Sequence, residues 1–266
     1  MPLSSYMSLP ALPDSFEWTQ ESWGAALRCK AVSSVAPHVF TTRQLSLTVP
    51  GDERRLAEAL GARAVAMATQ VHGRTVIVVR QGVEVPAARP EADAFVSSAS
   101  DVAVAVRAAD CVPLLIADRA RGVVAAVHAG WRGTAARVAV AAVDALAREF
   151  GSQPSDLVAA IGPSIGPCCY EVGSELVDAF AAAGHERSLI DRWFLAPAPP
   201  RGSRERPNLR LDVAGANRDQ LLLAGVPEEQ IHLSGLCTAM HLDLLTSYRA
   251  EKEKAGRIVG AIRANL

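Results

Sequence analysis

The chain has 266 residues, of which 50% are apolar, and a formal net charge of −1 at pH 7. These values are typical of a globular protein with a sizeable core, and the near-neutral charge argues against nucleic acid or an anionic membrane surface as a partner. Residues 1–18 have no basic region before an apolar run, and the most apolar window, residues 102–117, is too short to span a bilayer, so we expect a cytoplasmic protein.

The apolar pattern predicts short strands followed by amphipathic helices. A helix is expected over residues 52–60, and six strands follow at 64–70, 75–79, 93–97, 102–106, 112–117 and 123–128. The second half is expected to contain helices at 134–149, 172–183 and 212–224, with strands at 157–162, 231–233 and 257–262. Residues 196–208, rich in Pro, Gly and Arg, are predicted to form a surface loop. The order favours one α/β domain over residues 1–266, a mixed sheet with flanking helices.

One pair of strands allows a geometric prediction. The short segment DRARG, residues 118–122, separates the strands 112–117 and 123–128 and is typical of a hairpin turn. If Asp118 pairs with Arg121, Cys111 lies directly opposite His128. Directly opposed residues have Cβ atoms about 4.5–5.5 Å apart, which suits two ligands of one metal ion.

The five cysteines, at positions 29, 111, 168, 169 and 237, are predicted to be free thiols, because their number is odd and two are adjacent. The sequence has no CxxC, HExxH or phosphate-loop motif. Taken singly, His72 could be a turn residue, Cys111 a small buried side chain and His128 a hydrogen-bonded strand end.

Taken together, several segments are far more specific. They occur in the order ATQVHG (68–73), EADAFVS (91–97), ADCVPLLIAD (109–118), AAVHAGWRGTAARV (125–138), AAIGPSIGPCCYEVG (159–173) and SYRAEKEKAGR (247–257). From about residue 38 to the C-terminus, the chain thereby resembles the laccase-domain family. Its members are described as multicopper polyphenol oxidases, purine nucleoside phosphorylases or peptidoglycan editing factors.

The resemblance implies a site for a metal ion, usually described as zinc. Its implied ligands are His72, Cys111 and His128, and these three residues are also the implied catalytic centre. Three protein ligands suit a catalytic zinc ion, which keeps a fourth position open. Asp110, next to Cys111, is a candidate acid or base.

Three further residues are expected to bind substrate or phosphate, namely Arg43, Gln70 and Arg132. Arg132 precedes the helix predicted at 134–149, whose free N–H groups and positive dipole end would favour an anion. The family's usual segment after the TTR motif is shortened here, so substrate affinity or selectivity is expected to differ on the side of Arg43.

The resemblance further implies a zinc-dependent purine nucleoside phosphorylase acting on adenosine, inosine, guanosine and methylthioadenosine, with adenosine deaminase activity. The expected partners are therefore a small purine nucleoside and phosphate.

Three alternatives stay open. A copper polyphenol oxidase is compatible with soft ligands, but six histidines lack the pairs that a multicopper cluster needs. A cysteine amidase acting on peptidoglycan precursors would use Cys111 as nucleophile, which metal ligation opposes. A non-catalytic zinc module would need a fourth ligand, which Cys168, Cys169 or Cys237 could supply.

Overall fold

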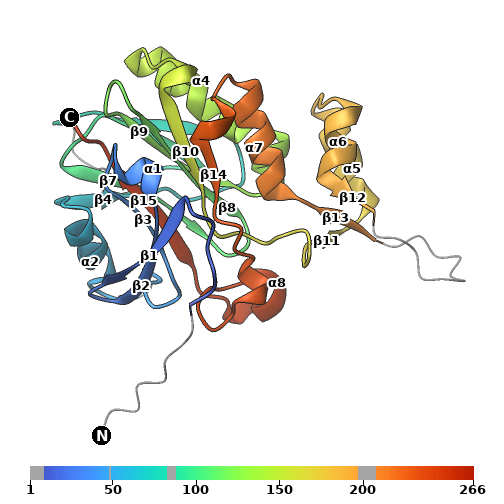
Figure 1. The fold of residues 1–266 in the computed structure, drawn as a ribbon, viewed down its shortest axis with the longest axis horizontal. Coiled ribbons are helices and arrows are strands. Elements are labelled where there is room, and N and C mark those ends of the chain that lie inside the picture. The colour runs from blue at the N-terminus through green and yellow to red at the C-terminus, as the bar shows by residue number, and fades with distance from the viewer. Residues whose placement is uncertain (1–8, 48, 83–87, 197–207) are drawn as a thin grey trace, which may run out of the picture.

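Two six-stranded sheets form the frame of the molecule, shown in Figure 1. The computed structural model describes residues 9–47, 49–82, 88–196 and 208–266. The first sheet has the order β1 (Phe16–Glu21), β2 (Gly24–Cys29), β3 (His38–Thr41), β15 (Ile258–Arg263), β7 (Val102–Ala108) and β4 (Ala64–Ala66). The second has the order β14 (Ile231–Leu233), β10 (Leu157–Ile161), β8 (Val112–Asp118), β9 (Val124–Ala129), β6 (Ala94–Ser97) and β5 (Val76–Val79).

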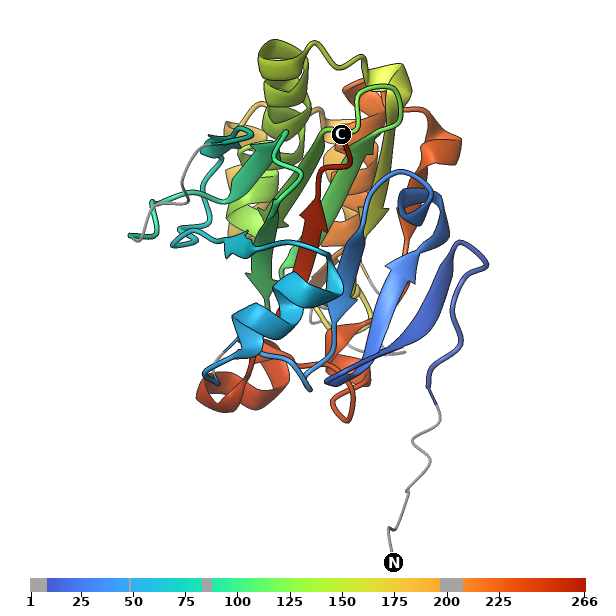
Figure 2. The same ribbon diagram turned by 90° about the vertical axis from the view of Figure 1, so that its left-hand side faces the viewer.

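Helices cover the outer faces of both sheets. Helix α2 (Asp52–Ala59) packs on the first sheet, and α4 (Val138–Phe150) and α7 (Val213–Leu223) pack on the second, as Figures 1 and 2 show. A small three-stranded sheet of β11 (Glu171–Val172), β13 (Leu209–Leu211) and β12 (Phe194–Leu195) lies beside α5 (Ser174–Ala182) and α6 (Arg187–Trp193). Short helices α1 (Lys30–Ser33), α3 (Trp131–Ala135) and α8 (Tyr248–Glu251) complete the set. No helix among the described residues is long and apolar enough to cross a membrane.

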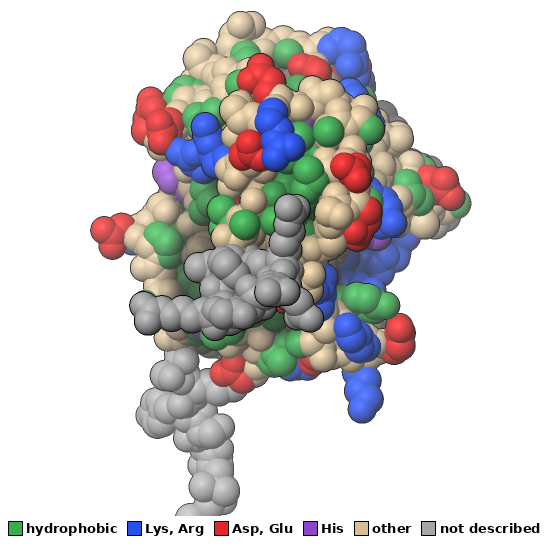
Figure 3. Space-filling view, turned by 90° about the vertical axis from the view of Figure 1, so that its right-hand side faces the viewer, with side chains coloured by type: hydrophobic (Ala, Val, Ile, Leu, Met, Phe, Trp, Pro, Cys, Tyr) green, Lys and Arg blue, Asp and Glu red, His purple; other side chains and the backbone are tan. Residues whose placement is uncertain are grey.

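The surface around α5 and α6 carries mixed charge. Figure 3 shows this face, on which acidic and basic side chains are interspersed with hydrophobic ones. Such mixing agrees with the net charge of −1 and gives this face no extended field of one sign.

The four inner strands of the second sheet, β10, β8, β9 and β6, are buried on both faces, which explains their continuous apolar runs. In β9, Ala125 and Val127 pack toward the helices, whereas Val124 and Ala126 pack against the first sheet. Because side chains alternate along a strand, His128 belongs to the set that faces the first sheet. The histidine therefore ends its strand at the edge of the layer between the two sheets.

The α/β class with a mixed sheet and flanking helices is confirmed, and all the predicted strands are present, β14 (Ile231–Leu233) with the predicted bounds and the others with different ends. The predicted helix 134–149 was wrong at its start, because two helices, α3 and α4, occupy this region. Arg137 separates them with a left-handed φ of 60°, and its guanidinium donates to the carbonyls of Ala183 and Gly184. The surface loop predicted at 196–208 falls almost wholly on residues 197–207, outside the described part of the chain.

The β8–β9 hairpin exists, but its predicted register was wrong by two residues. Pro113, not Cys111, pairs directly with His128. Cys111 lies just before β8, diagonally across from the histidine. A shift of two residues keeps every side chain on its predicted face, since the side-chain period of a strand is two.

The turn explains the shift. The N–H of Asp118 donates to the carbonyl of Val123 at 2.9 Å, so the turn contains two more residues than predicted. The Asp118 carboxylate accepts the N–H groups of Ala120 and Arg121 at 2.8 and 2.9 Å, which stabilises the wider loop. Gly122 closes it with a left-handed φ of 67°.

A buried histidine joins β3 to β2 and makes stability depend on pH. The N–H of Cys29 donates to Nε2 of His38 at 2.9 Å, so this nitrogen must stay unprotonated. Nδ1 lies 3.3 Å from the carbonyl oxygen of Ala36 and can donate to it. Burial lowers the pKa of His38 to about 4, even though the bond to Ala36 raises it.

We therefore expect acid to destabilise the fold through His38. The folded-state pKa lies below the unfolded value, so the contribution is complete above about pH 6.5 and is lost as the pH falls toward 4. At pH 5 the loss should be about 2 kcal/mol in the free energy of unfolding. Urea unfolding at pH 7.5 and pH 5 measures it. His38→Gln, which keeps an acceptor but cannot titrate, should reduce the difference by that amount, and an unchanged difference would contradict this assignment.

Candidate active site

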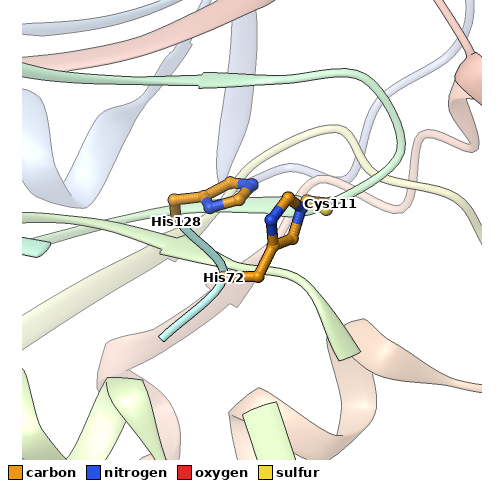
Figure 4. Close-up of side chains that lie close together, drawn as sticks. All are labelled: His72, Cys111 and His128. Atoms are coloured by element: carbon orange, nitrogen blue, oxygen red, sulfur yellow. The ribbon is translucent and has the colours of Figure 1, made fainter. Parts of the chain in front are cut away.

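His72, Cys111 and His128 come together at one end of the layer between the two sheets. Their ligating atoms all lie within 4.8 Å of one another, and Figure 4 shows the three side chains converging. The two imidazole rings meet edge to face with centroids 4.9 Å apart. His128 is buried in β9, Cys111 is half-buried before β8, and His72 is exposed on the loop between β4 and β5. The cluster is thus rigid on the sheet side and open at His72.

Asp93, immediately before β6, orients both histidines. Its carboxylate is buried, and Oδ1 lies 2.8 Å from Nδ1 of His128. The same carboxylate accepts the backbone N–H groups of His72 at 2.9 Å and Gly73 at 2.6 Å. Binding Nδ1 leaves Nε2 of His128 free to act as a ligand, and the two backbone bonds fix the loop that carries His72.

Sequence reasoning missed Asp93. The available signal was a single carboxylate at the first position of the strand predicted at 93–97. A carboxylate there can equally cap a turn, so the signal does not distinguish the two roles.

The charges within the cluster are interdependent. Burial raises the pKa of the Cys111 thiol, but hydrogen bonds from His128 and His72, with their charge, outweigh burial and lower it to about 6. Burial lowers the pKa of His128, yet hydrogen bonds to Asp93 and Cys111 raise it to about 9. The arrangement therefore favours a thiolate balanced by positive charge, which a metal cation can supply in place of a proton.

The donor set fits a borderline-soft cation. Two imidazole nitrogens and one thiolate are ligands of zinc, with bonds of about 2.0–2.3 Å. A tetrahedral ion with such bonds needs ligand atoms about 3.5 Å apart, which the limit of 4.8 Å allows. Gly130 leaves room for this arrangement, because a Cβ atom there would lie 2.8 Å from Sγ of Cys111 and 2.9 Å from Cδ2 of His72.

Gly130→Ala is therefore expected to weaken metal binding by about tenfold or more, since the added methyl group pushes two ligands apart. Competition with a chromophoric zinc chelator measures the change. Gly256→Ala is a matched control for adding a methyl group, because a Cβ atom there would have the hydroxyl oxygen of Thr246, at 3.8 Å, as its nearest neighbour. Equal zinc affinity in the Gly130 variant and the wild type would contradict this account.

The cluster lies in the wall of a cavity of about 550 Å³. Besides the three residues, two groups of side chains line this cavity. The cationic group is Arg107, Arg249, Lys252 and Arg257, and the aromatic group is Trp131, Tyr170 and Tyr248. Sequence reasoning assigned no role to either group, although the segment 247–257 had been noted as part of the family pattern.

Asp110 and Gln70 line the same cavity, but both are engaged in hydrogen bonds. The Asp110 carboxylate accepts the Thr238 hydroxyl at 2.6 Å and the N–H of Arg249 at 2.6 Å. The Gln70 amide accepts the N–H of Arg107 at 2.8 Å and donates to its carbonyl at 2.7 Å. Asp110 thus holds α8 at the cavity, and Gln70 fixes the backbone of Arg107, one of the four cationic residues that line the cavity.

The structure does not bring Arg43 to the cavity. Its guanidinium forms an ion pair of 2.9 Å with Glu251 and donates to the carbonyl of Leu242. Arg132 is exposed in α3 and stacks over the ring of Trp131, 4.2 Å from its centroid. The predicted location of Arg132 before a long helix was wrong, because it lies inside the short α3 and α4 begins only at residue 138.

Comparison with known proteins agrees with the fold. A family model described as multi-copper polyphenol oxidoreductase laccase matches residues 39–265. A purine nucleoside phosphorylase of Bacteroides thetaiotaomicron is 37% identical over 170 residues, which are 64% of this chain and 60% of that protein. An adenosine deaminase, RL5, from an unknown prokaryotic organism is 39% identical over 155 residues, 58% of this chain and 55% of that protein. The chain thus spans less than two thirds of the length of either protein.

Another relative is matched in both sequence and structure. The purine nucleoside phosphorylase YlmD of Geobacillus stearothermophilus is 35% identical over 224 residues, 80% of this chain and 78% of that protein. The crystal structure of YlmD superposes with a TM-score of 0.78 at 32% identity, covering 96% of this chain and 100% of that one. The chain therefore belongs to the multi-copper polyphenol oxidoreductase laccase family.

Proposed function

We propose that this chain is a zinc-dependent purine nucleoside phosphorylase that also deaminates adenosine. The observation that carries the proposal is one cavity that joins the His72–Cys111–His128 cluster to a cationic wall and an aromatic wall. The names of the relatives support a nucleoside as substrate. Adenosine, inosine, guanosine and methylthioadenosine are the proposed substrates.

The cationic wall is suited to phosphate. Among the described residues, none of its four side chains forms an ion pair with a carboxylate; the four are Arg107, Arg249, Lys252 and Arg257. Burial, together with the charges of Arg89 and Arg257, lowers the pKa of Arg107. A bound phosphate would relieve this crowding of like charges and would accept planar, directed hydrogen bonds from the guanidinium groups.

The aromatic wall is suited to a purine ring. Trp131, Tyr170 and Tyr248 offer flat apolar surfaces, and Arg249 covers Tyr170 at 5.1 Å from its ring centroid. Burial and the nearby negative charge of Cys111 raise the pKa of Tyr170 to about 12. The hydroxyl therefore keeps its proton at neutral pH and can donate it in a hydrogen bond to the base or the ribose.

The two reactions need different parts of this site. In phosphorolysis an oriented phosphate attacks the anomeric carbon of the ribose while the base leaves, and the cationic wall would hold that phosphate in position. A bound zinc ion supplies Lewis-acid activation of water, as deamination of adenine requires. Residues 72, 111 and 128 would hold the ion, and Asp93 would keep His128 in the ligating orientation.

Arg107→Met is expected to raise the KM for phosphate by about tenfold or more, because it removes a half-buried cation while keeping a long apolar stem. Deamination of adenosine needs no phosphate and should change much less. Steady-state kinetics of both reactions on one preparation measures the difference, with the exposed Arg54→Met as control. Equal losses in the two reactions would mean that Arg107 shapes the cavity instead of binding phosphate.

The proposed function is tested with a panel of the four nucleosides, with and without phosphate. We expect free base and the sugar 1-phosphate only when phosphate is present, namely ribose 1-phosphate or, from methylthioadenosine, 5-methylthioribose 1-phosphate. Inosine should form from adenosine in either case. Base release independent of phosphate, or turnover of phenols in place of nucleosides, would contradict the proposal.

A second candidate is supported by the hydrogen-bond chain from Cys111 through His128 to Asp93. A nucleophile, a base and an orienting carboxylate in this order are the parts of a cysteine hydrolase. Metal-free protein would then cleave amides such as those of peptidoglycan precursors. An assay of amide hydrolysis in the presence of a chelator distinguishes this candidate, since metal bound to Sγ would suppress it.

A further inference from the structure

A second cluster of thiols lies outside the residues that line the main cavity. The Sγ atoms of Cys168, Cys169 and Cys237 all lie within 4.8 Å of one another, and those of Cys168 and Cys169 are 3.5 Å apart. Cys168 is exposed, Cys169 is half-buried and Cys237 is buried. The cluster is therefore reachable from solvent but anchored in the protein.

Backbone hydrogen bonds hold the thiols in place. The N–H of Cys169 donates to the carbonyl of Gly166 at 3.0 Å, which fixes the turn between β10 and β11. Cys237 pairs with Ser164 in an isolated parallel bridge. The N–H of Gly166 donates to Sγ of Cys237 at 3.3 Å, which helps to fix the position of this sulfur. The three sulfurs thus come from two segments that the backbone ties together.

The neighbourhood supplies positive charge. The guanidinium of Arg210 in β13 donates to the carbonyls of Cys168 and Pro167. Burial, together with the neighbouring thiols, raises the pKa of Cys169 to about 12. Without a cation this thiol therefore keeps its proton at neutral pH, and a metal ion must displace that proton to bind there.

We propose that Cys168, Cys169 and Cys237 form a second metal site, specific for a soft monovalent cation such as Cu(I). Thiolates are the ligands that Cu(I) prefers, and three sulfurs satisfy its trigonal coordination. Structural zinc requires four ligands, and among the described residues no fourth His, Cys, Asp or Glu joins this group. Each thiol that ligates as a thiolate releases its proton to solvent, and the copper keeps its oxidation state. This site is independent of the proposed nucleoside chemistry.

Anaerobic titration with Cu(I) tests the proposal on reduced, full-length protein that has first been saturated with zinc, so that residues 72, 111 and 128 are occupied. A Cu(I)-specific chelator competes for the copper. We expect the wild type to retain one equivalent of Cu(I) per chain with a sulfur-only coordination shell in X-ray absorption. Cys168→Ala and Cys169→Ala should each bind it about hundredfold more weakly, because two sulfurs remain.

Cys29→Ala is the matched control, since Cys29 is a free thiol buried in the first sheet, and it should bind Cu(I) like the wild type. Cys168 is exposed, so its replacement should not impair folding, and thermal melting verifies this. Equal retention by the wild type and Cys168→Ala would overturn the proposal. Nitrogen ligands around the retained copper would also overturn it, because they would place the ion on His72 and His128. Neither readout depends on nucleoside turnover.

Discussion

Cys111→Ala is expected to abolish metal retention and nucleoside turnover while leaving the fold intact. The thiolate is the one anionic ligand among the three residues of the cluster, and its loss leaves two imidazoles that bind zinc weakly. We expect kcat/KM to fall by about a thousandfold or more, equivalent to about 4 kcal/mol of transition-state stabilisation. The side chain is only half-buried before β8, so the packing that it contributes is small.

Metal analysis per chain, steady-state kinetics and thermal melting measure these three effects. Cys29→Ala removes a buried thiol far from the cluster in sequence and should retain both metal and activity. A Cys111→Ala protein that still bound one zinc ion and turned over normally would show that Cys111 is a packing residue.

Asp93→Asn is expected to weaken zinc binding by about 10–100-fold, although the residue does not itself ligate. The carboxylate accepts hydrogen bonds from Nδ1 of His128 and from the backbone N–H groups of His72 and Gly73 at the same time. An asparagine has a single acceptor oxygen, so its NH₂ group must face at least one of these donors. The His72 loop then loses at least one hydrogen bond, and His128 loses its orienting acceptor when the NH₂ group takes the place of Oδ1.

Competitive chelator titration measures the zinc affinity of this variant. Asp101→Asn is the control, because Asp101 pairs with Arg63 at 2.6 Å on the surface and is not adjacent to the cluster in sequence. Added zinc should restore most of the activity of Asp93→Asn, since the three ligands remain. An unchanged zinc affinity would contradict the orienting role of Asp93.

The sequence was sufficient to predict the strands that carry the site. The apolar runs of β8 and β9 follow from burial on both faces, and burial is local to each strand. The register was not predictable, because it depends on hydrogen bonds from the Asp118 carboxylate to Ala120 and Arg121. The predicted register was wrong by two residues, which is one full side-chain period of a strand. Cys111 and His128 therefore still lie on the same face of the hairpin, and their side chains are still close together.

The other residues around the cavity are placed by contacts between segments that are distant in the sequence. Arg249, Lys252 and Arg257 reach the cavity because β15 pairs with β7, a neighbour that the apolar pattern does not specify. Arg43 carried a predicted binding role, but it pairs with Glu251, 208 residues away. Strand β1 was not predicted because polar and charged residues interrupt its apolar ones, and β2 and β3 were not predicted because their apolar runs, Ala25–Leu27 and Val39–Phe40, are short.

The central claim is that one metal ion at His72, Cys111 and His128 supports nucleoside turnover in this cavity. The most direct test strips the purified protein with a chelator, adds back zinc in steps, and follows adenosine turnover with phosphate present. Our account predicts that activity disappears on stripping and returns in proportion to zinc, reaching its maximum at one equivalent per chain. Full adenosine turnover in the stripped protein would contradict the account.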